Sequence, residues 1–349
     1  MEGTQDLDSA IIASFPNGGN VVSIVPHGKT RWSVGLRIEV ERDDGKKEVF
    51  FLKIIERKEW VGMAEAEYEG QKALFEKIPD NVTAPLAWGM LQADPTKSFF
   101  LTRFRNLLDS PPPVVELLTV LKKLHIDSVS PTAKFGFHVT TYFGPPPMIN
   151  DWTDSWEEYF GRQFHADMVY VQQVFGADPE LVDLTEEFVD KVVARLLRPL
   201  QTGGRRIKPS LCHGDLWDGN VQIDADTQQP IIFDAACFYG HSEMDLQCMG
   251  DSRYALGMDF IDSYKKEVGA SEPVEDFNER HELYALSLVG MRCADNYALR
   301  RCDFVVAALA PQQWAKLLEP SKEHMKQMIA RYPGGYGDFQ EGFGGDSKI

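Results

Sequence analysis

Short apolar, strand-like stretches separated by polar and turn residues mark the first hundred residues, and this pattern predicts a small antiparallel sheet. The expected strands are residues 20–25, 34–40, 48–55, 87–90 and 98–102. The sequence Asp43-Asp44-Gly45 separates the second and third strands and has the chemistry of a hairpin turn. Helical spacing over residues 61–77 predicts one helix in this region, which Pro79 ends.

Beyond residue 113 the apolar spacing becomes helical. The expected helices are residues 114–125, 152–174, 179–200, 245–268, 277–309 and 311–331. The pattern therefore predicts an α+β protein with two lobes, in which an N-terminal antiparallel sheet with one helix precedes a larger, mainly helical lobe. We place the lobes at residues 1–104 and 105–335, followed by a flexible, glycine-rich tail at 336–349.

The composition excludes several classes of partner. The chain has 349 residues and a net charge of -17, which disfavours nucleic acid and anionic membrane surfaces as partners. No apolar run approaches the length of a membrane span, and the acidic N-terminal residues do not resemble a signal peptide. The five cysteines have no C-x-x-C spacing, so we expect reduced thiols and a cytoplasmic protein.

The segment His213-Gly214-Asp215-Leu216-Trp217-Asp218-Gly219-Asn220 carries the strongest chemical signal. An apolar strand, Pro230 to Phe233, follows it and ends at Asp234. A carboxylate, an amide five residues later and a second carboxylate after a strand are the groups that kinase-type phosphoryl transfer requires. We predict Asp215 as the catalytic base, and Asn220 and Asp234 as ligands of the Mg²⁺ that accompanies ATP.

The N-terminal region offers partners for the phosphates of ATP. Lys53 stands in an apolar strand, where an ammonium needs an anionic partner, and Glu67 on the next helix can supply it. Glu69 is the alternative. The turn that contains Gly28 and Lys29 can cover the phosphates, although an ordinary hairpin turn fits it equally well. Position along the chain alone places Thr102 and Phe104 near the adenine.

These motifs resemble the fructosamine kinase (ketosamine-3-kinase) family. The resemblance rests on the Trp217-containing loop, on Phe233-Asp234-x-Ala236-Cys237-x-Tyr239-Gly240-His241-x-Glu243-x-Asp245-Leu246, and on the earlier blocks Phe135 to His138 and Asn150 to Trp156. Together these blocks cover most of the second lobe. Aminoglycoside and choline kinases share only the broader H-G-D-x-x-x-x-N skeleton with a later aspartate.

The resemblance implies a protein-kinase-like fold and ATP-dependent phosphorylation of the 3-hydroxyl of a ketosamine, a fructosamine or a ribulosamine. The new phosphate can then leave by β-elimination, and the amine is freed, so the protein would act in deglycation. Trp217, His241, Glu243 and His138 are the implied substrate residues. On chemistry alone, Trp217 fits a buried core position equally well, and His138 a structural one.

The sequence departs from the family pattern at two places. Ala235 replaces the proline that usually follows the metal-binding aspartate, and residues 290–297 lack the asparagine- and histidine-rich stretch of the family. The substrate preference can therefore differ, and a kinase of another small alcohol is the main alternative. A nucleotide-binding pseudokinase is less favoured, because Lys53, Asp215, Asn220 and Asp234 are all present.

The expected partner is a small-molecule or protein-bound ketosamine. The oligomeric state and the sugar are left open by the sequence. The final residues Ser347-Lys348-Ile349 differ by one side chain from the Ser-Lys-Leu peroxisomal signal, so a peroxisomal location is an alternative to the cytoplasm.

Overall fold

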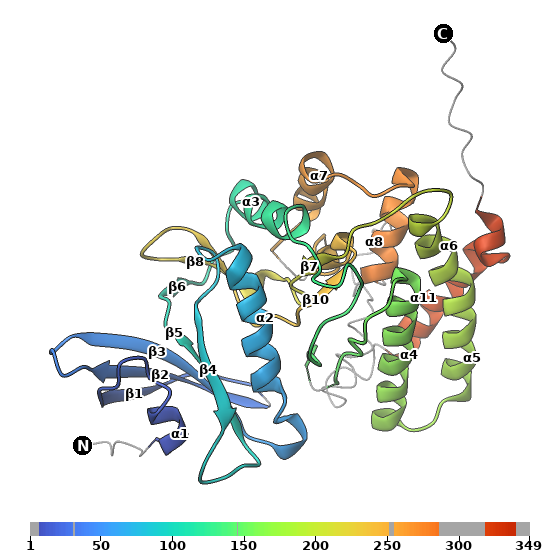
Figure 1. Cartoon of the computed structure of the whole chain (residues 1–349). Coiled ribbons are helices and arrows are strands. Elements are labelled where there is room, and N and C mark those ends of the chain that lie inside the picture. The colour runs from blue at the N-terminus through green and yellow to red at the C-terminus, as the bar shows by residue number, and fades with distance from the viewer. Residues whose placement is uncertain (1–6, 31, 145, 251–254, 286–317, 340–349) are drawn as a thin grey trace. The chain divides into compact units, whose positions relative to one another are not determined.

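The computed structural model describes residues 7–30, 32–144, 146–250, 255–285 and 318–339. The chain divides into two compact units (Figure 1). Unit 1 comprises residues 1–128, 137–150 and 211–238, and unit 2 comprises residues 129–136, 151–210 and 239–349. Unit 1 thus combines the sheet region with the segment that carries Asp215 and Asp234. The compact units therefore do not follow the expected lobe boundary at residue 104, because the motif segment packs with the N-terminal part of the chain.

Unit 1 is built on a five-stranded antiparallel sheet with the order β1-β2-β3-β5-β4. The strands are β1 (Asn20–Lys29), β2 (Ser33–Glu41), β3 (Lys47–Ile55), β4 (Pro85–Met90) and β5 (Ser98–Arg103). Each expected strand is confirmed. Gly45 adopts a φ of 79° in the turn between β2 and β3, as the hairpin chemistry predicts.

Alternation along β3 explains how a lysine occupies an apolar strand. Phe50 and Leu52 join a buried cluster with Ile11 and Phe15, on the side of the short helix α1 (Ser9–Ile12). Lys53 and Ile55 point to the opposite face because successive side chains of a strand alternate. On that face Ile55 packs with Met63 of α2 (Met63–Lys77). The strand therefore presents Lys53 toward α2 while its neighbours fill the core.

The rest of unit 1 supports the motif segment. A three-stranded sheet has the order β6-β8-β9. The other helix and strands of this part are α3 (Val114–His125), β6 (Leu107–Leu108), β7 (Ser210–Cys212), β8 (Val221–Asp224), β9 (Pro230–Ile232) and β10 (Phe238–Gly240). The boundary between the two units follows Phe238, the first residue of β10. The Asn81 side-chain amide donates to the Pro230 carbonyl at 2.9 Å, and the Ile232 amide donates to the Asn81 carbonyl at 2.9 Å. These bonds tie β9, and with it Asp234, to the segment that follows α2.

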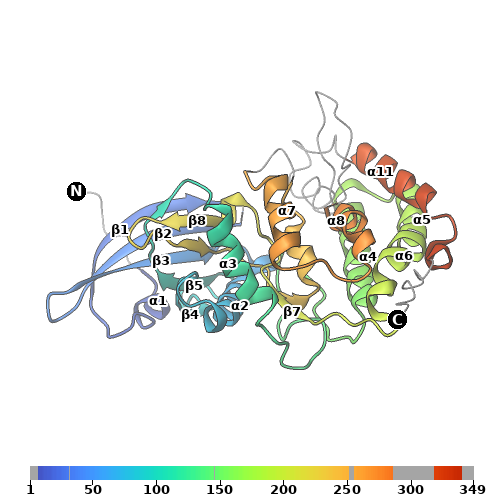
Figure 2. The ribbon, with the colours of Figure 1, turned by 90° about the horizontal axis from the view of Figure 1, so that it is seen from above.

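Unit 2 is mainly helical. Its helices are α4 (Trp156–Phe175), α5 (Pro179–Phe188), α6 (Ala194–Leu197), α7 (Met258–Glu267), α8 (Phe277–Ala285) and α11 (Leu318–Arg331). A π-helical turn, Val189–Val193, joins α5 to α6. Figures 1 and 2 show α4, α5 and α11 side by side. Aromatic rings fill the interior, with Trp156 stacked on Tyr159 and Phe164 stacked on Phe188.

The predicted helix over residues 245–268 is wrong in its first half. Residues Ser242–Leu246 form a 3₁₀ turn, and α7 begins only at Met258. Gly250 has a φ of 83°, a left-handed conformation that interrupts a right-handed helix. The apolar residues of this stretch are buried without helical periodicity, which is why spacing alone misled the prediction.

The C-terminal predictions are tested only in part. Residues 286–317 and 340–349 lie outside the described part of the chain, so the altered stretch 290–297 and the tripeptide at 347–349 do too. Within the expected tail, Tyr336 stacks on Phe339, and the Tyr336 hydroxyl donates to Thr202 Oγ1 at 3.1 Å. The first residues of that tail are therefore packed against the rest of unit 2.

Two further expectations concern the environment of the chain. The described cysteines, Cys212, Cys237 and Cys248, are buried and are not joined to one another by a disulfide, while the other two lie outside the described residues. In the part of the chain that the structure describes, no helix combines the length and apolar character needed to cross a membrane.

Acidification is expected to destabilise unit 2 through His324. Burial lowers the pKa of His324 to about 4, and its ring nitrogens have no hydrogen-bond partner among the described residues. Below a pH of about 6.5 His324 binds a proton in the unfolded chain but not in the folded chain. The free energy of unfolding therefore decreases as the pH is lowered. Between pH 7 and pH 5 this group should remove about 2 kcal/mol, measured by urea unfolding. His324→Leu should flatten that dependence, and an unchanged slope would contradict the assignment.

Candidate active site

Three charged side chains from distant parts of unit 1 meet at the centre of the site. The Lys53 ammonium on β3 lies 2.8 Å from Glu67 Oε2 on α2 and 3.0 Å from Asp234 Oδ1 after β9. The Lys53 and Glu67 side chains are each 11% exposed, whereas that of Asp234 is 43% exposed. The structure thus gives Lys53 the partner that the sequence favoured, and Asp234 is the member of the triad that faces open space.

The charges of the triad are linked. Burial alone would lower the pKa of Lys53, but the carboxylates of Asp234 and Glu67 raise it. Burial raises the pKa of Glu67 to about 7 against the opposing charge of Lys53. Burial also opposes ionisation of Asp234, yet Lys53 holds the pKa of that carboxyl below its ordinary value. One ammonium is shared by two carboxyl groups, so the triad carries an excess of negative charge, which suits a cation, whenever Glu67 is ionised.

Glu69, the alternative partner of Lys53, is engaged elsewhere. Its Oε2 lies 3.0 Å from His138 Nε2. His138 is therefore in unit 1, paired with α2, and its ring is half-exposed. The helical rotation explains the difference between the two glutamates, because residues 67 and 69 point about 200° apart on a helix. Contact of His138 with a substrate stays a prediction.

Hydrogen bonds within the loop from His213 to Asn220 position Asp215. The Asp215 amide donates to His213 Nδ1 at 3.3 Å, so His213 Nε2 carries the proton and donates to the Phe233 carbonyl at 2.9 Å. The Asn220 amide nitrogen donates to the Asp215 carbonyl and to Asp215 Oδ2, both at 2.9 Å. The loop therefore fixes the Asp215 carboxylate, and the Asn220 amide oxygen takes no part in these bonds.

Two glycines are required by the tight path of this loop. Gly214 has a φ of 84°, and a Cβ there would lie 2.3 Å from the Ala236 carbonyl oxygen. A Cβ at Gly219 would lie 2.1 Å from the ring of Trp217. The half-buried Trp217 indole thus lies against its own loop, and its predicted contact with a sugar stays a prediction.

Asp234 has an unusual backbone. Its φ is 56°, in the left-handed region that non-glycine residues rarely adopt. The adjacent Phe233 holds this conformation in place, because its amide donates to the Asn220 carbonyl at 3.1 Å and its own carbonyl accepts from His213. Strained residues of this kind are concentrated at functional sites, where the surrounding structure enforces them.

A cavity of about 400 Å³ in unit 1 adjoins the triad. The predicted nucleotide residues all line it: Gly28, Lys29, Lys53, Glu67, Thr102 and Phe104. The Thr102 hydroxyl donates to the Ala84 carbonyl at 2.9 Å, and the Phe104 amide donates to the Val49 carbonyl at 3.1 Å. These two residues therefore line the cavity, while the Thr102 hydroxyl and the Phe104 amide are used in hydrogen bonds to backbone carbonyls.

Sequence reasoning missed further residues of this cavity. His27 packs edge-on against Phe51 and Phe104, with ring centroids 5.9 and 5.0 Å apart. Gln71 donates through Nε2 to the Thr83 carbonyl at 2.6 Å, closing the inner wall. Gln71 lies one helical turn beyond Glu67 on α2, so its spacing from that glutamate was the available signal.

A second, smaller cavity of about 90 Å³ shares Lys53, Glu67 and Asp234 with the first as lining residues. Asp215, Asp234, Lys53 and Glu67 line it, together with the aromatic residues Trp32 and Tyr142. The structure therefore brings the expected base, one expected metal ligand and the expected phosphate-binding lysine to one cavity. Trp32 and Tyr142 were not predicted, because they are far from the motif in the chain.

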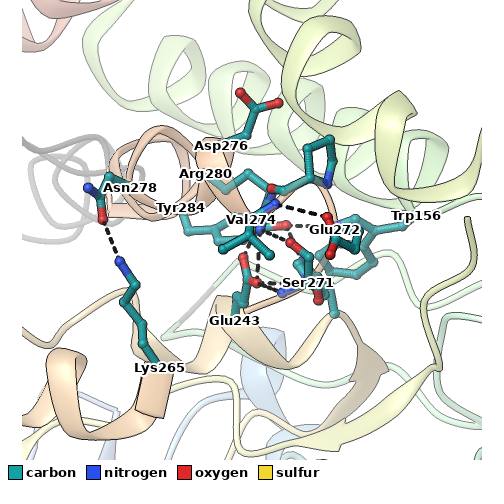
Figure 3. Close-up of polar contacts among 12 residues, drawn as sticks. Trp156, Glu243, Lys265, Ser271, Glu272, Val274, Asp276, Asn278, Arg280 and Tyr284 are labelled. Carbon is teal, nitrogen blue, oxygen red and sulfur yellow. Dashed lines mark hydrogen bonds and ion pairs between the residues drawn. The ribbon is translucent and has the colours of Figure 1, made fainter. Parts of the chain in front are cut away.

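His241 and Glu243 have a different setting from the other expected site residues. Both are buried in unit 2, where Glu243 forms a two-bond ion pair with Arg280 at 2.8 and 3.0 Å (Figure 3). His241 Nδ1 lies 2.7 Å from the Tyr284 hydroxyl, and His241 Nε2 lies 2.8 Å from Ser271 Oγ. These bonds join the start of the 3₁₀ turn to α8. Substrate contact by either residue stays a prediction.

Loss of the Glu243 carboxylate is expected to destabilise the protein. Arg280 is fully buried, so Glu243→Ala would leave an unpaired buried guanidinium at a cost of about 3–5 kcal/mol, measured by urea unfolding. Replacing Glu243 and Arg280 together by methionine should recover much of this loss, because no charge is then left buried. A loss below about 1 kcal/mol in Glu243→Ala would contradict a structural role for the pair.

Comparison with known proteins gives consistent results. A sequence model described as fructosamine kinase matches residues 32–294. A protein-ribulosamine 3-kinase of Oryza sativa subsp. indica is 32% identical over 229 residues, which is 64% of this chain and 61% of that protein. A ketosamine-3-kinase of Mus musculus is 35% identical over 153 residues, 44% of this chain and 46% of that protein. The match thus spans less than two thirds of each of these relatives.

Solved structures confirm the predicted protein-kinase-like α+β fold. A fructosamine-3-kinase structure from Haemophilus somnus superposes with a TM-score of 0.68 at 18% identity, covering 92% of this chain and 96% of that one. The aminoglycoside phosphotransferase APH(4)-Ia, in a ternary complex with AMP-PNP and hygromycin B, superposes with a TM-score of 0.59 at 13% identity. That comparison covers 96% of this chain and 99% of the other.

Proposed function

Because this chain belongs to the fructosamine kinase family, we propose that it transfers the γ-phosphoryl group of ATP to the 3-hydroxyl of a ketosamine. The observation that carries the proposal is the meeting of Asp215, Asp234 and Lys53 at one cavity. A base, an anionic cation-binding group and a phosphate-binding cation at one point are the groups that this transfer needs.

The larger cavity is suited to ATP. Its volume of about 400 Å³ is within the usual range for small-molecule sites, and its walls combine aromatic side chains with the Lys53 ammonium. His27 and Phe104 supply apolar contacts for a purine, and Lys29 supplies a cation beside Gly28 for the phosphates. The structurally similar aminoglycoside phosphotransferase was solved with AMP-PNP, which supports nucleotide binding by this fold.

The donor set also fits a magnesium ion. Asp234 contributes a carboxylate with a lowered pKa, and Asn220 an amide oxygen not used by its loop contacts. Both are hard oxygen ligands of the kind that Mg²⁺ prefers. When bound there, the ion would neutralise the charge of the ATP phosphates. Lys53 remains paired with Glu67 and supplies a second positive charge to the same phosphates.

Asp215 orients and accepts the proton of the acceptor hydroxyl. As the oxygen forms its bond to the γ-phosphorus, the bond from that phosphorus to the bridging oxygen breaks and ADP leaves with the electron pair. The hydroxyl proton passes to Asp215 Oδ1 or Oδ2. The Asn220 side chain donates to Oδ2 and so holds the carboxylate in one orientation. The 3-phosphate can afterwards leave by β-elimination, which releases the amine and completes deglycation.

The test is ADP release from Mg-ATP with ribulose-lysine, fructose-lysine, choline and an aminoglycoside. Turnover with a ketosamine alone supports the proposal and identifies the sugar. Turnover with choline or the aminoglycoside alone would instead support the kinase of another small alcohol. An absence of turnover on all four, with ATP still bound, would favour a pseudokinase.

A further inference from the structure

The position of the reacting hydroxyl limits where the amine of a ketosamine can bind. This inference rests on the function proposed above. In a ketosamine the nitrogen is attached to the first carbon, four covalent bonds from the oxygen of the 3-hydroxyl. With bonds of about 1.5 Å, the two atoms can be separated by no more than about 5 Å. A hydroxyl at Asp215 therefore places the nitrogen within the same small region of the protein.

The 90 Å³ cavity beside Asp215 has an aromatic wall as well as its charged groups. Trp32 reaches it from the turn between β1 and β2, and Tyr142 from the segment 137–150. Both rings pack against the cluster of Ile55, Met63, Ala64 and Phe100. Neither Trp32 nor Tyr142 has a part in the phosphoryl transfer described above.

Both rings are held in place by the surrounding structure. The Trp32 amide donates to Thr30 Oγ1 at 3.3 Å, and the Trp32 indole meets that of Trp60 edge-on with centroids 6.4 Å apart. Tyr142 is bridged to Pro147, and its hydroxyl packs so closely over Gly62 that a Cβ there would lie 2.7 Å from the oxygen. The aromatic wall is therefore preorganised.

The charges around the wall favour a cation. Among the groups that line the cavity, the carboxyl groups of Glu67, Asp215 and Asp234 outnumber the single ammonium of Lys53, and they do so even when Glu67, with its pKa of about 7, is partly protonated. Burial raises the pKa of the Tyr142 phenol, and the nearby negative charge of Glu65 adds to this effect. The phenol therefore stays neutral, and its ring lines a cavity whose charged groups are mainly carboxylates.

We propose that Trp32 and Tyr142 form the subsite for the protonated amine of the ketosamine and thereby select aminated sugars over neutral ones. The secondary amine of a ketosamine carries a proton near neutral pH, and a cation is attracted to the face of an indole or phenol ring. The cavity of about 90 Å³ has room for a small group such as an aminomethyl group.

The subsite is tested by binding, without turnover. Two ligands that lack the 3-hydroxyl are compared by calorimetry on the full chain with Mg-AMP-PNP. One carries a methylamino group on the first carbon and the other carries a methoxy group there. The wild-type protein should prefer the amine by at least about ten-fold, and Trp32→Leu or Tyr142→Leu should reduce this preference to about three-fold or less.

Control variants separate this subsite from a general loss of structure. Tyr68 packs against the same cluster without lining either cavity, so Tyr68→Leu should keep the wild-type preference. Trp32→Phe should restore part of it, since a benzene ring also attracts cations. An equal affinity of the wild type for both ligands, no binding of either, or an unchanged preference in both leucine variants would overturn the inference. Because binding is measured, an amine preference with no ADP release from any ketosamine would count against the proposed function alone.

Discussion

Asp215→Asn should lower the rate of ADP release with Mg-ATP and a ketosamine by about 10³-fold, while the affinity for ATP changes by less than about two-fold. General base catalysis contributes about 10²–10⁴-fold, and an amide cannot accept the hydroxyl proton. The substitution preserves shape, and an amide oxygen can still accept the hydrogen bond from Asn220. The loop should therefore keep its structure while the base is lost.

The measurement is steady-state ADP release together with calorimetric titration of ATP. Asp226→Asn is a matched control, because it makes the same change at an exposed turn of the same region, between β8 and β9. Turnover by Asp215→Asn at the rate of this control would contradict the proposed role of Asp215 as the catalytic base. A parallel loss of ATP binding would show instead that Asp215 mainly supports the structure.

Asp234→Ala is expected to weaken both the binding of Mg-ATP and turnover. Loss of the carboxylate removes a proposed metal ligand and one of the two partners of Lys53. The affinity for Mg-ATP should fall by at least about ten-fold, which is 1.4 kcal/mol. The rate should fall by about 10²–10³-fold, as when one group that stabilises developing charge is removed.

The backbone of Asp234 calls for a second variant at this position. Its φ of 56° is tolerated by asparagine but costs alanine about 1 kcal/mol or more. Asp234→Asn therefore tests the charge without the strain. In calorimetry, both variants should lose the gain in affinity that Mg²⁺ gives over EDTA. An equal weakening with Mg²⁺ and with EDTA would contradict the role of Asp234 as a metal ligand.

Much of the local structure followed from short-range patterns. Strand-like apolar stretches bounded by turn residues placed every strand of the main sheet, and helical spacing placed α2 and α3 to within two residues at each end. The same rules failed over residues 245–250, where buried apolar residues precede Gly250 and that glycine adopts a left-handed conformation. Apolar content alone cannot distinguish a buried irregular segment from a buried helix.

The sequence favoured Glu67 over Glu69 as the partner of Lys53, and a finer argument for this choice was available. Glu67 shares a helical face with the buried residues Met63, Gly70 and Leu74, whereas Glu69 does not. A carboxylate within a buried stripe requires a cationic partner, and Lys53 on the adjacent strand provides it. The pairing of Glu69 with His138, 69 residues away, had no comparable local signal.

By itself, the sequence determined the chemical inventory of this protein: a lysine, three carboxylates and an amide in the order expected of a kinase, on elements that local patterns predict. Only the tertiary structure decided which groups meet. Lys53 and Asp234 are 181 residues apart in the chain, and Trp32 and Tyr142 come from segments with no shared motif. It also decided that His241 and Glu243 are buried among partners of their own. The reason is physical: propensity and periodicity depend on near neighbours, whereas a site depends on contacts between residues that only the packing of the whole unit brings together.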